Sequence, residues 1–156
     1  MRRLAVLLAT GFGLGRLPVA PATWASAATA LILLPLLPRI PLLPFLVLTV
    51  VVTALAVPAC GEAEKTLGHD ARPIVADEIA GMMVTMCGAP ALEHGGPPYA
   101  VTLLAGFALF RLFDIWKPPP VDRAQSLPGG FGVVMDDVLA GVYANLALQL
   151  LARVWR

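Results

Sequence analysis

Charged residues and cysteines are both scarce in this sequence. Only 13% of its 156 residues are charged and 58% are hydrophobic, whereas soluble globular domains average about 25% charged residues. The mean hydropathy of +0.81 therefore indicates an integral membrane protein, with a very apolar soluble helical bundle as the alternative. The length predicts a single domain over residues 1–156.

The two cysteines, Cys60 and Cys87, are too few for a disulfide framework, and neither belongs to a Cys-x-x-Cys motif. Both lie in or beside apolar runs, so we expect them to pack as small hydrophobic side chains. No cluster of histidine and cysteine indicates a zinc site. Because the net charge is +1 and the sequence has no basic run, no nucleic-acid partner is expected.

Residues 1–9 are similar to the start of a signal peptide, with two arginines before an apolar run. The run breaks at the glycine-rich residues 11–16, which leaves a short apolar region without a convincing cleavage site. Secretion is therefore not expected. These glycines also do not indicate a dinucleotide-binding fold, because no clear strand precedes them.

Turns rich in proline and glycine divide the remaining sequence into apolar segments. One segment is rich in valine, but only helices and closed barrels cross a bilayer, and a single strand cannot close a barrel. We therefore predict an all-α fold, a compact bundle of about five main apolar helices in a multi-pass membrane protein. The predicted ranges are Thr23–Leu37, Leu42–Pro58, Ile74–Leu92, Tyr99–Asp114 and Met135–Val154.

The segments between these helices are polar or rich in proline. Residues 61–73 are predicted to open with a short helix that ends at Gly68, and residues 93–98 form a turn. Three prolines at positions 118–120 stop the fourth helix, because proline removes a backbone donor and clashes with the preceding turn. Several apolar runs are shorter than the roughly 20 residues of a full span. We therefore expect the helices to extend beyond the hydrocarbon, with their charged ends in an interfacial pocket.

Alternating helix directions would place every acidic residue except Glu93 at one end of the bundle. Most lysines and arginines fall at the same end, which the positive-inside rule makes cytoplasmic. Five of the acids lie at helix ends at similar depth. These are Asp77, Glu78, Asp114, Asp136 and Asp137.

An acidic pair at a helix start has an ordinary explanation, because carboxylates cap free amides and favour the positive end of the helix dipole. Asp114 does not fit that explanation, since it is predicted at a helix C-terminus. Several convergent carboxylates suit magnesium, which prefers oxygen ligands. Gly81 and Gly141 each lie one turn beyond an acid, where a small residue lets two helices approach closely.

Arg111 and Lys117 flank Asp114 in the sequence. Cations beside a metal–carboxylate centre fit a phosphate substrate, and the alternative is that both side chains anchor the helix at the membrane interface. His69 fits a solvated loop residue better than a ligand. Other phosphatase signatures are missing, including Cys-x5-Arg, Asp-x-Asp and the aspartate pattern of CDP-alcohol phosphotransferases.

Three blocks of the sequence resemble the phosphatidylglycerophosphatase A family of membrane lipid phosphatases. Residues 70–81 match Asp-x3-Ile-Val-x-Asp-Glu-x2-Gly, and residues 110–120 read Phe-Arg-Leu-Phe-Asp-Ile-Trp-Lys-Pro-Pro-Pro. Residues 129–141 match a Gly-Gly-x-Gly block that leads to Asp-Asp-x-x-Ala-Gly, with a one-residue ambiguity before the aspartates. The resemblance implies magnesium-dependent hydrolysis of phosphatidylglycerophosphate to phosphatidylglycerol and phosphate at the cytoplasmic face of a bacterial-type inner membrane.

The N-terminal block departs from the family pattern. The family usually has Pro-Gly-Thr-aromatic-Gly-Ser, whereas residues 21–26 read Pro-Ala-Thr-Trp-Ala-Ser. Two glycines are replaced by alanine, which bears on how closely this turn approaches the substrate. Thr23 is nevertheless included with Arg111 and Lys117 as a residue that binds the substrate phosphate.

The expected roles follow from these observations and from the resemblance. We assign Asp77, Glu78, Asp136 and Asp137 to metal binding or water activation, with Glu64 and Asp70 as further metal candidates; Asp114 would ligate the metal or orient Lys117. One alternative is a small cation or proton transporter that uses the same carboxylates, although a transporter favours acids near the membrane centre. The other is a scaffold subunit, which would not explain Arg111, Asp114 and Lys117 together.

Overall fold

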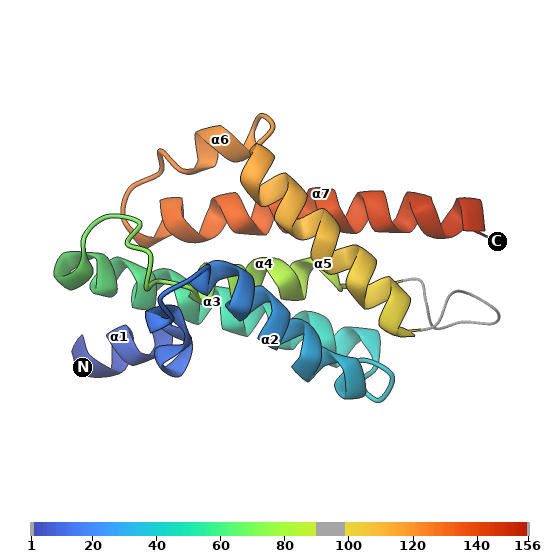
Figure 1. Ribbon diagram of the computed structural model, residues 1–156, viewed down its shortest axis with the longest axis horizontal. Coiled ribbons are helices and arrows are strands. Elements are labelled where there is room, and N and C mark those ends of the chain that lie inside the picture. Colours follow the sequence, from blue (N-terminus) through green and yellow to red (C-terminus); the bar gives the residue numbers. More distant parts are fainter. Residues whose placement is uncertain (1, 90–98, 156) are drawn as a thin grey trace.

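A computed structural model describes residues 2–89 and 99–155 of the chain (Figure 1). Within these ranges the secondary structure is entirely helical, which confirms the predicted all-α fold. The elements in chain order are α1 (Arg2–Ala9), the 3-10 helix η1 (Gly11–Arg16), α2 (Pro21–Leu36), α3 (Leu42–Leu67), α4 (Ala76–Thr85), α5 (Tyr99–Trp116), α6 (Val121–Ala124) and α7 (Gly130–Trp155).

Several helix boundaries differ from the predicted ones. α3 continues through Pro58 and the polar residues after it, and it ends at Leu67, just before Gly68, whose φ is 103°. α7 begins at Gly130 instead of Met135. α4 ends at Thr85 instead of continuing to Leu92. The predicted turn at residues 93–98, with Glu93, lies outside the described residues.

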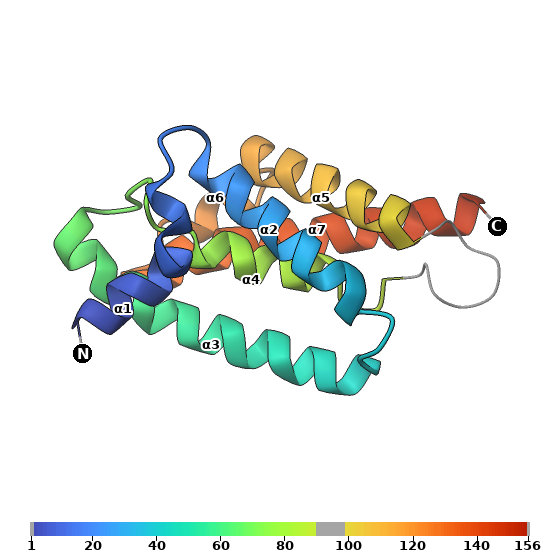
Figure 2. The ribbon, with the colours of Figure 1, turned by 60° about the horizontal axis from the view of Figure 1, so that its bottom comes forward.

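Three helices, α3, α5 and α7, are long and apolar enough to cross a membrane. The directions of α2, α3, α4, α5 and α7 alternate as predicted, so the end of α3 and the starts of α4 and α7 lie together (Figure 1). The shorter α4 packs against α2, α3, α5 and α7. Figure 2 shows it in the middle of the bundle, between α3 and α5.

Two glycines allow α4 and α7 to approach each other closely. A Cβ atom on Gly141 would lie 2.4 Å from the carbonyl oxygen of Gly81. A Cβ atom on Gly81 would lie 2.5 Å from Cε2 of Phe110 and 2.7 Å from the carbonyl oxygen of Asp137. Any side chain at either position would therefore push the two helices apart. This is the close packing that the spacing of the two glycines predicts.

Residues 2–9, whose sequence is similar to the start of a signal peptide, form α1, and this helix packs into the fold. Ala9 is buried in a cluster with Ala56, Ala59, Cys60 and Ala63 of α3. The backbone N–H of Val75 donates a hydrogen bond of 2.8 Å to the carbonyl of Ala9. The N-terminal helix is thereby fixed against both α3 and the residue that precedes α4.

We predict that Gly141→Ala destabilises the protein by about 1–3 kcal/mol, the usual cost of forcing an extra group into a packed interior. Thermal unfolding in detergent measures the effect. Gly106→Ala is the matched control, because its new Cβ would meet chiefly the flexible side chain of Met86, at 2.9 Å from Sδ. Equal stability of the Gly141→Ala and Gly106→Ala proteins would contradict the role given to the α4–α7 contact.

Candidate active site

Three acidic side chains from two helices meet inside the bundle. Asp77 and Glu78 belong to the first turn of α4, and Asp137 lies on α7. One carboxylate oxygen from each lies within 4.8 Å of the other two. All three residues are buried, with exposed fractions of 6%, 8% and 4%. We call Asp77, Glu78 and Asp137 the acid cluster.

Helix capping does not account for this cluster. Asp77 accepts a hydrogen bond of 3.0 Å from the N–H of Glu78, and Asp136 accepts one of 3.0 Å from the N–H of Asp137. However, α7 starts at Gly130, so its first turn contains no acid. Glu78 Oε2 and Asp137 Oδ2 are buried and lack a hydrogen-bond partner in the described structure. A buried carboxylate without a partner carries a large desolvation cost, which a bound cation would offset.

Burial of the cluster changes the protonation of its α4 members. It raises the pKa of Asp77, and it raises the pKa of Glu78 well above the ordinary carboxyl value. The negative charges of Asp77 and Asp114 raise the pKa of Glu78 further. Because a divalent cation favours the ionised carboxylates, proton binding and metal binding would compete at this cluster.

Two cations form ion pairs with acids next to the cluster. Nη1 of Arg111 lies 2.8 Å from Oδ2 of Asp114 on the same helix. This contact is close but poorly aligned, since the buried Nη1 makes no well-directed hydrogen bond. Nζ of Lys117 donates a hydrogen bond of 2.5 Å to Oδ2 of Asp136 on α7. Both cations are thus held by carboxylates, and Arg111 retains an unused donor.

The backbone conformation at the end of α5 determines where the Lys117 side chain lies. Its N–H bonds the carbonyl of Phe113, and its φ of 46° turns the chain away from the helix before the three prolines. Burial lowers the pKa of Lys117, but the hydrogen bond to Asp136 and the nearby charges of Asp114 and Asp137 outweigh burial and raise it. Lys117 is therefore a permanent cation beside the acid cluster.

The other predicted site residues, Glu64, Asp70 and Thr23, are not members of the acid cluster. Glu64 Oε1 lies 2.5 Å from Nδ1 of His69 and accepts a hydrogen bond of 3.1 Å from the N–H of Asp70. Oδ2 of Asp70 in turn accepts a hydrogen bond from Gln125. Glu64 and Asp70 thus stabilise the loop after α3 and are not members of the acid cluster. Thr23 is half-buried in the first turn of α2.

Asn145 bonds the end of α4, a role that was not predicted from the sequence. Its Nδ2 donates hydrogen bonds to the carbonyls of Thr85 and Cys87, at 2.8 Å and 2.6 Å. These carbonyls lie at the C-terminal end of α4, where no further helical turn satisfies them. Gln149 similarly donates to the carbonyl of Gly88. The missed signal was a series at four-residue spacing on α7: Asp137, Gly141, Asn145 and Gln149.

The protein-family model described as Phosphatidylglycerophosphatase A matches residues 7–152. A Haemophilus influenzae protein named Phosphatidylglycerophosphatase A is 39% identical over 144 residues, covering 91% of this chain and 85% of its own length. An Escherichia coli protein of the same name is 34% identical over 153 residues, covering 96% of this chain and 84% of its own.

A third relative has a different name. A Bacteroides thetaiotaomicron protein, named provisionally as a phosphatidylinositol-3-phosphatase, is 37% identical over 151 residues. The match covers 94% of this chain and 92% of that protein. No solved structure matches the chain.

The raised pKa of Glu78 leads to a prediction about stability. The folded protein holds a proton that the unfolded chain releases above the ordinary carboxyl pKa, so the stability of the metal-free protein should be lower at the upper end of a pH series that starts below that ordinary pKa. Glu78→Gln removes this titration. In chelator at the upper pH, we expect the Glu78→Gln protein to unfold at a higher temperature than wild type. Its unfolding temperature should also change less with pH than that of wild type.

Glu62→Gln is the control for this experiment, because Glu62 forms surface ion pairs with Arg2 and Lys65. Loss of the Glu62 carboxylate should give no gain in stability at the upper pH. If Glu78→Gln behaves in the same way as Glu62→Gln, burial of ionised Glu78 does not destabilise the metal-free protein.

Proposed function

The chain belongs to the phosphatidylglycerophosphatase A family, and from this premise we propose that its lipid substrate is phosphatidylglycerophosphate, with phosphatidylglycerol and inorganic phosphate as the products. Membership makes the chain a phosphoric monoester hydrolase. The observation that carries the proposed reaction is the acid cluster, which has two unpartnered oxygens among the described residues, together with the cations Arg111 and Lys117, each paired with a further acid.

Magnesium is the metal that we assign to the acid cluster. The donors are all carboxylate oxygens, the class of ligand that magnesium prefers. Glu78 Oε2 and Asp137 Oδ2 are buried without partners, so Asp77, Glu78 and Asp137 would hold the ion. Bound there, it would neutralise part of the phosphate charge and orient the phosphate oxygens.

Arg111 and Lys117 bind the phosphate of the substrate. Each is oriented by an acid, Asp114 for Arg111 and Asp136 for Lys117. The pairing of Asp136 with Lys117 favours an orienting role for Asp136 over the predicted role as a metal ligand. A guanidinium can donate two parallel hydrogen bonds to a phosphate, and a lysine provides a compact positive charge.

Hydrolysis needs one proton acceptor and one proton donor. A carboxylate of the acid cluster accepts a proton as water attacks phosphorus. The bond between phosphorus and the glycerol oxygen then breaks, and the carboxylic acid formed in the first step gives its proton to that oxygen as the lipid alcohol leaves. Because the acid cluster is buried among apolar helices, bulk water is largely excluded and the charges interact strongly.

The location of the reaction is also proposed. Three helices are apolar enough to span a membrane, and the distribution of lysine and arginine favours a cytoplasmic position for the end that carries the acids. We assign the whole chain, residues 1–156, to one catalytic domain in a bacterial inner membrane. Thr23 remains a candidate for contact with the substrate phosphate, and Glu64 and Asp70 remain candidates for metal contact.

A cation or proton transporter accounts less well for the same residues. It would explain the buried carboxylates, but not the two cations paired beside them. Transport assays in vesicles would distinguish the two functions, since a phosphatase releases phosphate without moving an ion across the bilayer.

We predict that Asp77→Asn lowers phosphate release by more than about 100-fold, since even the outer partners of metal ligands change activity by about 10- to 100-fold. Membrane insertion and expression should be unchanged. Asp122→Asn is the matched control, because Asp122 is exposed on α6 and, among the described residues, accepts a hydrogen bond only from the neighbouring N–H of Arg123. Near-wild-type turnover by the Asp77→Asn protein would reject the assignment of Asp77.

Removal of metal provides a second test. The purified protein should release phosphate from phosphatidylglycerophosphate when magnesium is present and lose this activity in chelator, with recovery when magnesium is restored. Activity that survives chelation would reject the metal assignment while leaving the hydrolase intact. Phosphatidylinositol 3-phosphate is the comparison substrate, and faster turnover of that lipid would replace the proposed substrate.

A further inference from the structure

α1 has one face packed against protein and one face that is apolar and exposed. On the inner face, Ala9 is buried against α3. On the outer face, Leu4, Leu7 and Leu8 have exposed fractions of 59%, 44% and 36%, and Phe12 in the following turn is 76% exposed. Three exposed leucines within two helical turns are unusual on a surface that faces water but normal on a surface that faces lipid.

The level of α1 along α3 is fixed by direct contacts. Large apolar side chains are exposed along α3 from Leu42 as far as Leu55, as expected for a helix in contact with lipid. α1 lies immediately beyond this surface, because it packs against residues 56–63 of α3. Nε of Arg2 lies 3.1 Å from Glu62 Oε1. α1 therefore occupies the level at which a membrane-spanning helix changes from apolar to charged.

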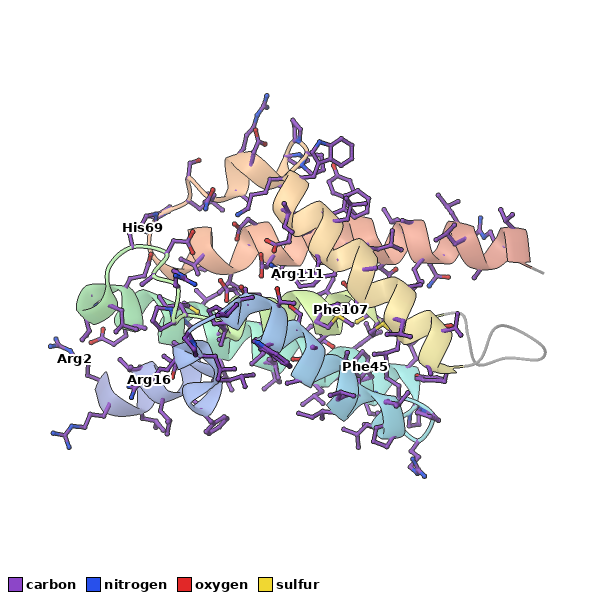
Figure 3. All side chains as sticks on the ribbon, viewed as in Figure 1. Arg2, Arg16, Phe45, His69, Phe107 and Arg111 are labelled. Carbon is purple, nitrogen blue, oxygen red and sulfur yellow. The ribbon has the colours of Figure 1, made fainter. Side chains whose placement is uncertain are left out.

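Arginines and an aromatic residue are also exposed in α1, η1 and the start of α2. Arg3 and Arg16 are exposed, and Figure 3 shows Arg2 and Arg16 at the same end of the molecule. Val19 and Trp24, at the junction with α2, are also exposed. Tryptophan and arginine are the residues that concentrate at the boundary between hydrocarbon and water, and arginine is attracted to anionic lipid headgroups.

We propose that α1 and η1 form an in-plane membrane-surface element. Its leucines and Phe12 insert among the lipids of the leaflet at this end of the bundle, and Arg3 and Arg16 bind anionic headgroups. The charge of the arginines is the reason for choosing an anionic lipid surface as the partner.

This element is joined directly to the helix that carries two acids of the acid cluster. Val75, whose N–H bonds the carbonyl of Ala9, is two residues before Asp77. A Cβ atom on Gly15 would lie 2.0 Å from the carbonyl oxygen of Pro73, so η1 packs backbone to backbone against the same segment. Contact with the lipid surface therefore sets the depth of α4 at the level of the headgroups.

The test uses a polarity-sensitive fluorophore on single cysteines of the full-length protein in lipid nanodiscs. The cysteine replaces Leu7 on α1, Val50 on the exposed apolar face of α3, or Lys65 near the end of α3. Cys87 is changed to alanine, and Cys60 is fully buried and remains. Protein without an added cysteine measures background labelling. Lipids with a nitroxide near the headgroup or in mid-chain, and a water-soluble quencher, report the depth of each label.

We expect the Leu7→Cys label to be quenched most by the shallow nitroxide, the Val50→Cys label by the mid-chain nitroxide, and the Lys65→Cys label by the aqueous quencher. If the Leu7→Cys label behaves like the Lys65→Cys label, α1 lies in water and the proposal fails. If no quencher reaches it, another protein surface covers α1, for example a second copy of the chain, and the proposal fails equally. Neither result depends on enzymatic activity.

The arginines are tested in the same assay with nanodiscs of phosphatidylcholine alone or mixed with phosphatidylserine, an anionic lipid that is not a product of the proposed reaction. Shallow quenching of the Leu7→Cys label should increase with phosphatidylserine, and this increase should weaken at high salt. Arg3→Gln with Arg16→Gln should abolish the increase. Arg39→Gln with Arg153→Gln, exposed sites outside α1 and η1, should not. Equal behaviour of the two double variants would reject anionic-lipid binding by α1 and η1.

Discussion

The burial of three carboxyl groups together in an apolar interior is the constraint on which the rest of the site depends. Each carboxylate would ordinarily remain in water, because the free energy of removing an ionised group from water is large. The chain brings Asp77, Glu78 and Asp137 together and leaves two of their oxygens without partners. Arg111 and Lys117 lie nearby, but they pair with other acids. The acid cluster therefore has no positively charged side chain paired with it among the described residues, an arrangement that could bind a metal ion.

The short length of α4 is part of the same arrangement. A helix that starts at one end of the bundle and stops inside it presents its first-turn carboxylates and also leaves free carbonyls at its other end. α7 serves both ends: Asp137 joins the acids, Gly141 admits the α4 backbone, and Asn145 bonds the last carbonyls. Polar groups in an apolar bundle need such partners, since lipid cannot supply hydrogen bonds. The two helices are thus held in register at both ends.

The sequence predicted much of this arrangement, for identifiable physical reasons. Apolar runs between prolines marked the main helices, and alternating directions brought acids from distant segments to one end. The boundaries were less accurate, because Pro58 lies inside α3 and the polar residues after it continue the helix. The early start of α7 at Gly130 removed capping as an explanation for Asp137. No pattern in the sequence shows that Lys117 bonds Asp136 rather than Asp114, since this depends on the left-handed backbone at Lys117.

The N-terminal helix was the main omission, because its partners are distant in the sequence. Arg2 and Glu62 are 60 positions apart, and the hydrogen bond between Ala9 and Val75 joins a still more distant pair. During synthesis, α1 leaves the ribosome well before the segment that completes its packing. This end of the molecule can therefore reach its final structure only after α2 and α3 have been made and residues 73–75 have emerged. Assembly of the acid cluster is later still, since it awaits Asp137 near the end of the chain.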